Sequence, residues 1–268
     1  MEAAILFVLG GLFTLLVRSL WLGMLKNCGL VALNYQQKEI PVSSGPLFLG
    51  STTFALWLGE LVGISSLSDR FSFLFLLAAL VLLGFIDDCL GGKDAKGFRG
   101  HFRSLFRGQL TTGGMKAIAG GFFSLVVATT LAEEPARILL AALLIAFSAN
   151  TLNLLDLRPG RALKSFWLGS ILLLWTRGGN LPLYPLLGAS VIWAPADFKG
   201  RAMLGDSGAN CLGAALGYSL AVSLSLPWQL AVVLFLLLLN LISEKYSFSA
   251  IIEGNPFLRF LDRLGRSQ

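Results

Sequence analysis

Long apolar runs recur along the chain, and they constrain its fold more than any other feature. The segment "FSFLFLLAALVLLGFI" at 71–86 is one of several that approach the length needed to cross the hydrocarbon core of a bilayer. Only 13% of the 268 residues are charged, against about 25% in an average soluble domain. The pattern predicts an all-α polytopic membrane protein, with a soluble protein of very large core as a remote alternative.

Proline, glycine and charged residues divide the apolar runs into about nine predicted spans. These cover 2–25, 42–65, 70–86, 113–131, 136–155, 162–176, 181–195, 207–226 and 228–246. We expect one domain over 1–247 and an amphipathic tail at 248–268, with loops 26–41, 87–112, 156–162 and 196–206 on one side. The start "MEAAILFV" has no basic region before its apolar run, so we expect a first span and not a cleaved signal peptide.

Lysine and arginine gather on one side of this predicted topology. Its loops hold 17 of the 21 basic residues, namely Lys26, Lys38, Lys93, Lys96, Arg99, Arg103, Arg107, Lys116, Arg158, Arg161, Lys164, Lys199, Arg201, Lys245, Arg259, Arg263 and Arg266. The positive-inside rule places these loops and the C-terminus in the cytoplasm and the N-terminus outside. The asymmetry accounts for the net charge of +6 without a nucleic-acid partner.

Carboxylates stand at four predicted helix ends on this same side. They are Asp87 and Asp88, Asp156, Asp197 and Asp206. Ionisable groups at such depths are rare and usually functional. Each motif alone also fits an interfacial charge or an unrelated sequence, but their shared side favours an enzyme that handles phosphates at the cytoplasmic membrane face.

Amide and basic side chains accompany these carboxylates. Asn150 and Asn153 precede Asp156 and add oxygen ligands, which Mg²⁺ prefers and often shares with substrate phosphates. Lys116, Arg158 and Lys164 are candidates for binding those phosphates. In the loop 87–112, "FRGHFRSLFRG" fits either a helix on an anionic membrane surface or a solvated loop helix, and its His101 is expected to be a surface residue.

Four segments together resemble the polyprenyl-phosphate N-acetylhexosamine-1-phosphate transferase family: "LGFIDDCLGG", "GQLTTGGMKAI", "NTLNLLDLRPGRALK" and "FKGRAMLGDSGANCLGAALG". The early segment "NYQQKEIPVSSGPLFLG" also looks like the first cytoplasmic loop of the family, and the resemblance covers about residues 26–217. It implies transfer of a sugar-1-phosphate from a UDP-sugar to undecaprenyl phosphate, with Mg²⁺ and release of UMP. It also implies a place in the bacterial cytoplasmic membrane, a role in synthesis of peptidoglycan, teichoic acid or a related envelope glycan, and a possible homodimer.

The resemblance also assigns roles to residues. Asp87 and Asp88 match paired aspartates, of which the first is expected to deprotonate the lipid phosphate and the second to position it or the metal. Asp206 matches the aspartate that holds Mg²⁺, while Asn153 and Asp156 match an Asn-x-x-Asp that lines the nucleotide and metal site. Lys116 matches a lysine near the phosphates.

Three departures from the family pattern keep a second interpretation open. The family's Asp-Gly-x-Asp-Gly is here "DLRPG", the last cytoplasmic stretch lacks its histidines, and a tenth helix is not predicted. In the tail, Asn255, Arg259 and Arg266 either replace those histidines in donor binding or belong to an amphipathic interfacial helix. The alternative to an enzyme is therefore an inactive homologue that binds polyprenyl phosphate or scaffolds an envelope-synthesis complex.

Overall fold

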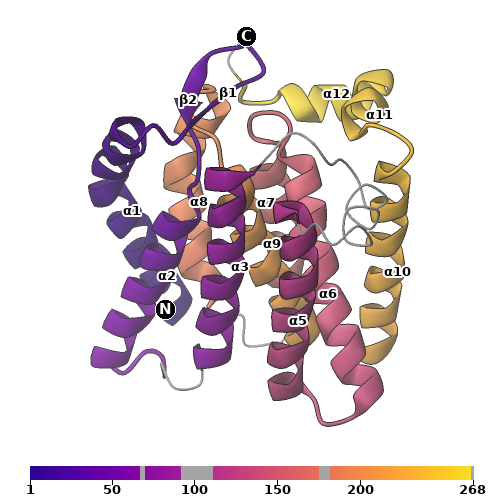
Figure 1. Ribbon diagram of the computed structural model, residues 1–268. Helices are drawn as coiled ribbons and strands as arrows, with labels where there is room; N and C mark the ends of the chain where they lie inside the picture. Colours follow the sequence, from indigo (N-terminus) through magenta and orange to yellow (C-terminus); the bar gives the residue numbers. More distant parts are fainter. Residues whose placement is uncertain (67–69, 92–110, 175–181, 267–268) are drawn as a thin grey trace.

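The computed structural model describes residues 1–66, 70–91, 111–174 and 182–266, and these form helices and one short hairpin (Figure 1). The helices are α1 (Glu2–Asn27), α2 (Gly45–Leu61), α3 (Phe71–Leu90), α5 (Thr112–Leu131), α6 (Pro135–Leu155), α7 (Arg161–Leu174), α8 (Leu183–Phe198), α9 (Gly205–Ser223), α10 (Leu226–Ser243), α11 (Phe248–Gly254) and α12 (Pro256–Arg263). The predicted loop helix around 99–107, with His101, lies outside the described residues.

Five of these helices, α1, α3, α5, α6 and α10, are long and apolar enough to cross a membrane. Large apolar side chains on their outer faces are exposed, among them Leu16 at 66% and Phe235 at 58%. Such faces suit hydrocarbon and not water, so the helices indicate a membrane protein, as predicted. The other four predicted spans coincide with α2, α7, α8 and α9, which length and hydropathy do not identify as spanning.

Helix α9 lies at the centre of the bundle, packed against α6, α3 and α2. Two of its glycines allow a close approach to the α6 backbone. A Cβ atom on Gly213 would lie 2.5 Å from Cα of Ala149, and one on Gly217 would lie 2.6 Å from Cα of Ile145. Small residues at a helix crossing let two backbones meet within van der Waals distance, which drives association where no hydrophobic effect acts between helices.

The structure differs from the predicted cytoplasmic loops in two places. Residues 31–41 contain an antiparallel pair, β1 (Val31–Leu33) and β2 (Glu39–Pro41), in which Val31 faces Pro41. The side-chain oxygen of Asn34 accepts the backbone N–H groups of Gln36 and Lys38 and forms the turn between the strands. Strands of three residues are too short to show an alternation of apolar and polar residues, so they were not predicted.

Helix α3 also runs further than expected, to Leu90 instead of residue 86. Asp87 and Asp88 therefore lie in its last turn and not beyond it. Hydrogen bonds from other helices satisfy both carboxylates there, so the polar residues do not end the helix.

The C-terminal tail crosses the end of the bundle and forms α11 and α12 (Figure 1). Asp262 of α12 accepts hydrogen bonds from Arg161 of α7, at 2.9 and 3.2 Å, and from Arg266 at 3.0 Å. Lys164 donates to the backbone carbonyls of Leu261 and Asp262 at 2.9 and 2.7 Å. Polar contacts thus attach the tail to the start of α7.

We expect Gly213→Ala to destabilise the bundle by about 1–3 kcal/mol, because its methyl group would overpack the α6 backbone. Gly121→Ala in α5 is the matched control, since no described atom beyond its own stretch of helix lies within 4 Å of an added Cβ. That variant should be neutral or stabilising by up to about 1 kcal/mol. Thermal unfolding in detergent, followed by circular dichroism, measures both; equal unfolding midpoints for the two variants would contradict the packing described.

The attachment of the tail should weaken in acid. Burial raises the pKa of Asp262, but hydrogen bonds and charges from Arg161 and Arg266 outweigh it and lower that pKa below the ordinary value. A lowered folded-state pKa contributes stability that is present above the unfolded value of about 3.9 and is lost as the pH falls through the folded value. Hydrogen-exchange protection of α12 should therefore fall selectively below about pH 4.

Asp262→Asn should reduce this protection already at neutral pH, by about 2 kcal/mol, because the charge-assisted bonds to two arginines are lost. Glu253→Gln is the control, since the Glu253 carboxylate lies 3.7 Å from Arg158 and is 59% exposed, so its loss should change little. Unchanged exchange in Asp262→Asn would show that the ion pairs do not hold the tail.

Candidate functional site

Lys116 lies at the centre of a polar cluster where three helices meet. Its ammonium group, on α5, forms ion pairs with Asp87 of α3 at 2.9 Å and with Asp206 of α9. All three side chains are partly buried: Asp87 is 15% exposed, Lys116 16% and Asp206 29%. Two carboxylates thus converge on one positive charge, which compensates part of their desolvation.

Asn153 of α6 adds a fourth helix to this cluster. With its amide oriented so that each atom meets a partner, Asn153 donates to Asp206 at 2.8 Å and accepts from Lys116 at 3.1 Å. The structure therefore brings together four of the residues singled out from the sequence: Asp87, Lys116, Asn153 and Asp206.

Local sequence signals set the helix ends that position these side chains. The Thr111 hydroxyl accepts the backbone N–H of Gly114 at 3.0 Å and caps α5, so that Lys116 falls within its first turns. Gly205 has a φ of +70°, a conformation that glycine adopts at little cost, and it turns the chain into α9 directly before Asp206.

Asp88 acts at the same end of the bundle but in a different way. Its two carboxylate oxygens accept the backbone N–H groups of Asp206 at 2.8 Å and of Ser207 at 3.1 Å. These are free donors of the first turn of α9, where the helix dipole also favours a negative charge. A Cβ on Gly205 would lie 2.8 Å from both oxygens, so the close approach requires glycine. Asp88 fastens α9, and with it Asp206, to α3.

Asp156 follows the last residue of α6 and is half-buried near other acids. Burial raises the pKa of its carboxyl group well above the ordinary value, and the negative charges of Asp197, Asp206 and Asp88 raise it further. A carboxyl group in such a place either keeps its proton or requires a cation.

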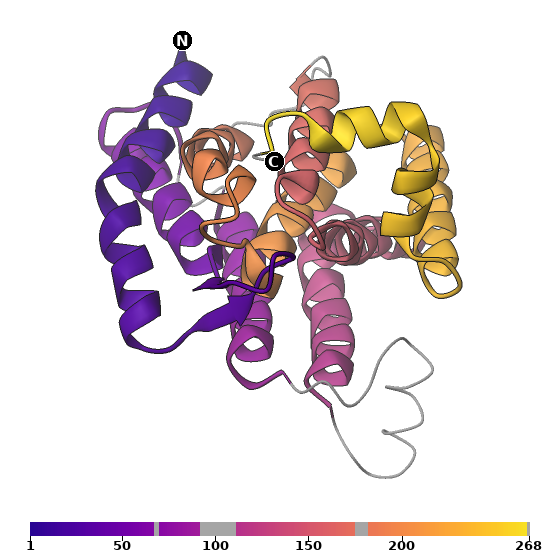
Figure 2. The ribbon, with the colours of Figure 1, turned by 90° about the horizontal axis from the view of Figure 1, so that it is seen from above.

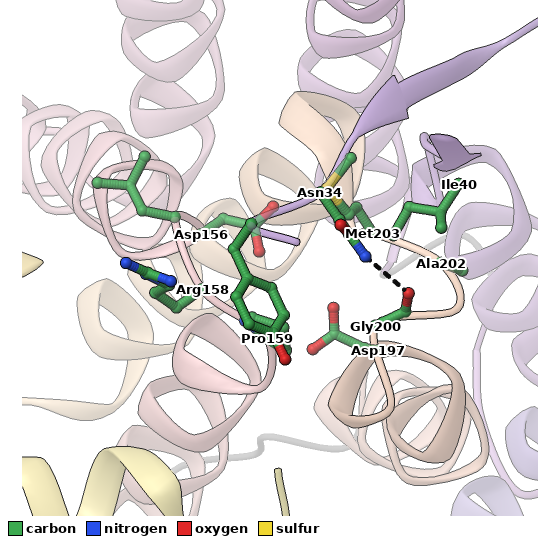
Figure 3. A pocket seen from close by; sticks show the side chains of 11 residues that line it. Asn34, Ile40, Asp156, Arg158, Pro159, Asp197, Gly200, Ala202 and Met203 are labelled. Carbon is green, nitrogen blue, oxygen red and sulfur yellow. Dashed lines mark hydrogen bonds between the residues drawn. The ribbon is translucent and has the colours of Figure 1, made fainter. Parts of the chain in front are cut away.

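A pocket opens beside Asp156 (Figure 3). Asp156 and Asp197 both direct their carboxyl groups toward it, and the side-chain amide of Asn34 donates to the Gly200 carbonyl at 3.1 Å on its wall. The Arg158 guanidinium stacks over the Tyr35 ring, 5.4 Å from its centroid. The lining residues are Asn34, Tyr35, Ile40, Asp156, Leu157, Arg158, Pro159, Asp197, Gly200, Ala202 and Met203.

The contribution of the hairpin to this pocket was not predicted from the sequence. Asn34 and Tyr35 come from the turn of the hairpin, and no spacing in the sequence relates them to Asp156. Asp197 carried a signal, because it is a carboxylate at the end of an apolar helix. In the structure it accepts the Gly160 backbone N–H at 2.6 Å and fixes the turn after Asp156.

Two further predicted residues are engaged elsewhere. The Asn150 amide donates to the side-chain oxygen of Asn240 on α10, and Asn240 in turn donates to Thr151 at 2.9 Å. This polar pair joins α6 to α10 within apolar surroundings. Lys164 binds the carbonyls of the tail helix α12 and lies over the Phe198 ring. Asn150 and Lys164 therefore hold together the helices around the site and do not line the polar cluster.

The cluster offers two carboxylates to a hard divalent cation, and other ligands would have to come from water or substrate. Among the described residues, no three His, Cys, Asp or Glu side chains form a group able to hold a metal by themselves. Mg²⁺ is commonly bound by one or two carboxylates, with waters and substrate phosphates as its other ligands. Asp87 and Asp206 form such a pair, and a cation, the Lys116 ammonium, already lies between them.

No protein-family model and no curated protein matches this chain. The resemblance to the sugar-1-phosphate transferases thus rests on the motifs quoted above.

The role of Asp88 can be tested by stability. Asp88→Ala should lower the free energy of unfolding by about 3 kcal/mol, because two buried N–H groups of α9 would lose a charged acceptor. Glu134→Ala is the control, since its carboxylate is 65% exposed. Thermal unfolding in detergent micelles reports the difference. An Asp88→Ala protein as stable as the control variant would rule out the anchoring role.

Proposed function

We propose that this protein transfers a sugar-1-phosphate from a UDP-sugar to undecaprenyl phosphate, or a related polyprenyl phosphate, and releases UMP. The reaction takes place at the cytoplasmic face of a bacterial cell membrane, in synthesis of an envelope glycan. In this proposal the chain crosses the membrane about nine times, with the N-terminus outside and the C-terminus in the cytoplasm. The positive-inside distribution of Lys and Arg supports that orientation.

One observation carries the proposal. Asp87, Lys116, Asn153 and Asp206 come from four different helices and converge in one partly buried cluster at one end of the bundle. A packing role alone gives little reason for burying two carboxylates and a lysine there, since apolar residues of similar volume would often serve as well. The four residues also match, in order, the motifs that resemble the transferase family.

The chemistry needs a site that neutralises negative charge. An oxygen of the lipid phosphate attacks the phosphorus that carries the sugar, a new P–O bond forms, and the bond to the UMP oxygen breaks. Both reactants are anions, so positive groups must offset their repulsion. Lys116 and Arg158 supply such groups, and Asp87 holds the Lys116 ammonium in place.

A strong general base is not required. The second pKa of a phosphate monoester is about 6, so the attacking phosphate is largely dianionic at neutral pH. We therefore assign Asp87 to positioning Lys116 and the cation in preference to removing a proton.

Asp87 and Asp206 would hold Mg²⁺, with Asn153 beside them and Asp156 nearby. When bound, Mg²⁺ supplies Lewis-acid stabilisation of the charge that develops on the phosphoryl oxygens. The pocket lined by Asp156, Arg158 and Tyr35 is our candidate for the nucleotide, because its stacked guanidinium and ring offer a flat surface next to the cluster.

A second candidate function is an inactive homologue that binds polyprenyl phosphate or scaffolds an envelope-synthesis complex. The observation in its favour is that Lys116 already occupies the position between Asp87 and Asp206. Leu157 and Pro159 also stand where the family has glycine and a second aspartate. Lipid binding that survives Asp206→Ala, together with no turnover in the unmodified protein, would favour this alternative.

The decisive experiment is a donor panel. Purified protein in detergent, with Mg²⁺, undecaprenyl phosphate and a series of UDP-sugars, should release UMP with at least one donor. Asp206→Asn and Asp87→Asn should each reduce the rate by about 10²-fold or more, because each removes a carboxylate that would hold the cation and that positions Lys116. Chelation of Mg²⁺ should abolish release, and added Mg²⁺ should restore it.

Glu134→Gln is the matched control for a lost carboxylate, because Glu134 lies between α5 and α6 at the opposite helix ends from the cluster, and it should keep full activity. Absence of UMP with every donor, beside an active reference enzyme, would refute the proposed reaction.

A further inference from the structure

Helix α12 presents an apolar face that no part of the described chain covers. Phe257, Phe260, Leu261 and Leu264 follow one another at spacings that place them on one side of a helix. Their exposed fractions are 68, 61, 39 and 47%. The helix is well formed, because Pro256 occupies its first position and the Asn255 side chain accepts the backbone N–H groups that follow.

The opposite face of α12 is the one that contacts the protein, and it is polar. Asp262 is 9% exposed and lies against Arg161 and Arg266. In a water-soluble protein an amphipathic helix turns its apolar stripe to the core and its charges to solvent. Here the arrangement is reversed, so the environment beyond the apolar face is not expected to be water.

The surface next to this face is apolar as well. Lys164 of α7 binds the carbonyls of α12, and Leu168 and Leu172 follow it on the same side of α7, one and two turns further on. These two leucines are 63 and 65% exposed. Seen from above in Figure 2, the tail runs along the rim of the bundle from the end of α10 toward α7. Its apolar face therefore continues the apolar outer surface of the membrane-spanning bundle.

Basic residues lie on the other sides of α12: Arg263 borders the apolar face, and Arg259 is turned away from it. Arg259 and Arg263 are both exposed, and from 256 to 268 three arginines oppose the single acid Asp262. A short amphipathic helix with aromatic and leucine residues on one face and arginine beside it is typical of a segment that lies in the interface of an anionic bilayer. The arginine heads can reach the lipid headgroups while their stems cover apolar surface.

We propose that α12 lies in the headgroup region of the same membrane that holds the bundle, with Phe257, Phe260, Leu261 and Leu264 directed into the acyl boundary. The bilayer surface thus covers the apolar face of α12 that the protein leaves exposed. On its inner side α12 is attached to the chain around Asp156, because Asp262 binds Arg161 and Arg266 donates to the Pro159 carbonyl at 3.1 Å. The membrane thereby supports the turn at 156–161 that borders the pocket. The proposed position of α12 in the membrane does not depend on the proposed transferase activity.

Spin labels at two neighbouring positions test this proposal. The full chain carries Cys28→Ser and Cys89→Ser, because both native thiols are exposed, whereas Cys211 is buried and is kept. A nitroxide is attached at Phe260→Cys on the apolar face or, as the matched control, at Arg259→Cys on the side turned away from it. The protein is placed in nanodiscs of two parts phosphatidylethanolamine and one part phosphatidylglycerol.

Collision of the label with oxygen and with a water-soluble nickel chelate is then compared. We expect a several-fold higher oxygen-to-chelate ratio at position 260 than at position 259, since oxygen concentrates in hydrocarbon and the chelate in water. A chelate-accessible label at 260 would overturn the proposal. So would a label shielded from both reagents, which would mean that a second copy of the chain or another protein covers the face. Circular dichroism and a single elution peak confirm that both labelled proteins are folded.

Discussion

The meeting of Lys116 with Asp87 and Asp206 is the interaction on which the polar end of this bundle depends. Charged groups this deeply placed are unfavourable unless they are paired, and the pairing here links α3, α5 and α9. Asn153 extends the link to α6. Removing Lys116 would leave the two carboxylates without a compensating positive charge. The same interaction that makes a reactive site possible therefore also fixes the relative position of the helices that build it.

A second interaction between α3 and α9 lies beside the ion pairs of Lys116, and it involves backbone groups. Asp88 binds backbone N–H groups and not a side chain, so it holds α9 at its start whatever the state of the neighbouring lysine. Adjacent aspartates thus divide two tasks between them: one faces the polar cluster and the other anchors the helix that carries Asp206. On the other side of the cluster, Asp197 holds the turn after Asp156 through the Gly160 N–H.

Most of the helices and four residues of the polar cluster could be predicted from the sequence. The partners of individual side chains could not, for identifiable physical reasons. The apolar runs predicted the helices, because lipid-facing segments need length and hydropathy that short windows reveal. The motifs predicted that Asp87, Lys116, Asn153 and Asp206 share one end. What could not be read was the partner of each group: Asp88 binds a backbone, Asn150 binds Asn240, and Lys164 binds a tail carbonyl. Such pairings depend on helix rotation and crossing, which composition does not specify. The hairpin that brings Asn34 and Tyr35 to the pocket was missed because its strands are only three residues long.

The central place of α9 has a consequence for biosynthesis. Its Gly213 and Gly217 lie directly against α6, and its first turn lies against α3, yet both of those helices are made before it. Helices α3, α5 and α6 enter the membrane while the chain for α9 is still being synthesised. Helix α5 packs directly against α3 and α6, whereas the contacts of α3 and α6 with α9 can form only after α9 has been made. Gly213 and Gly217 therefore take part in a late step of assembly, in which α9 packs against helices that were made before it.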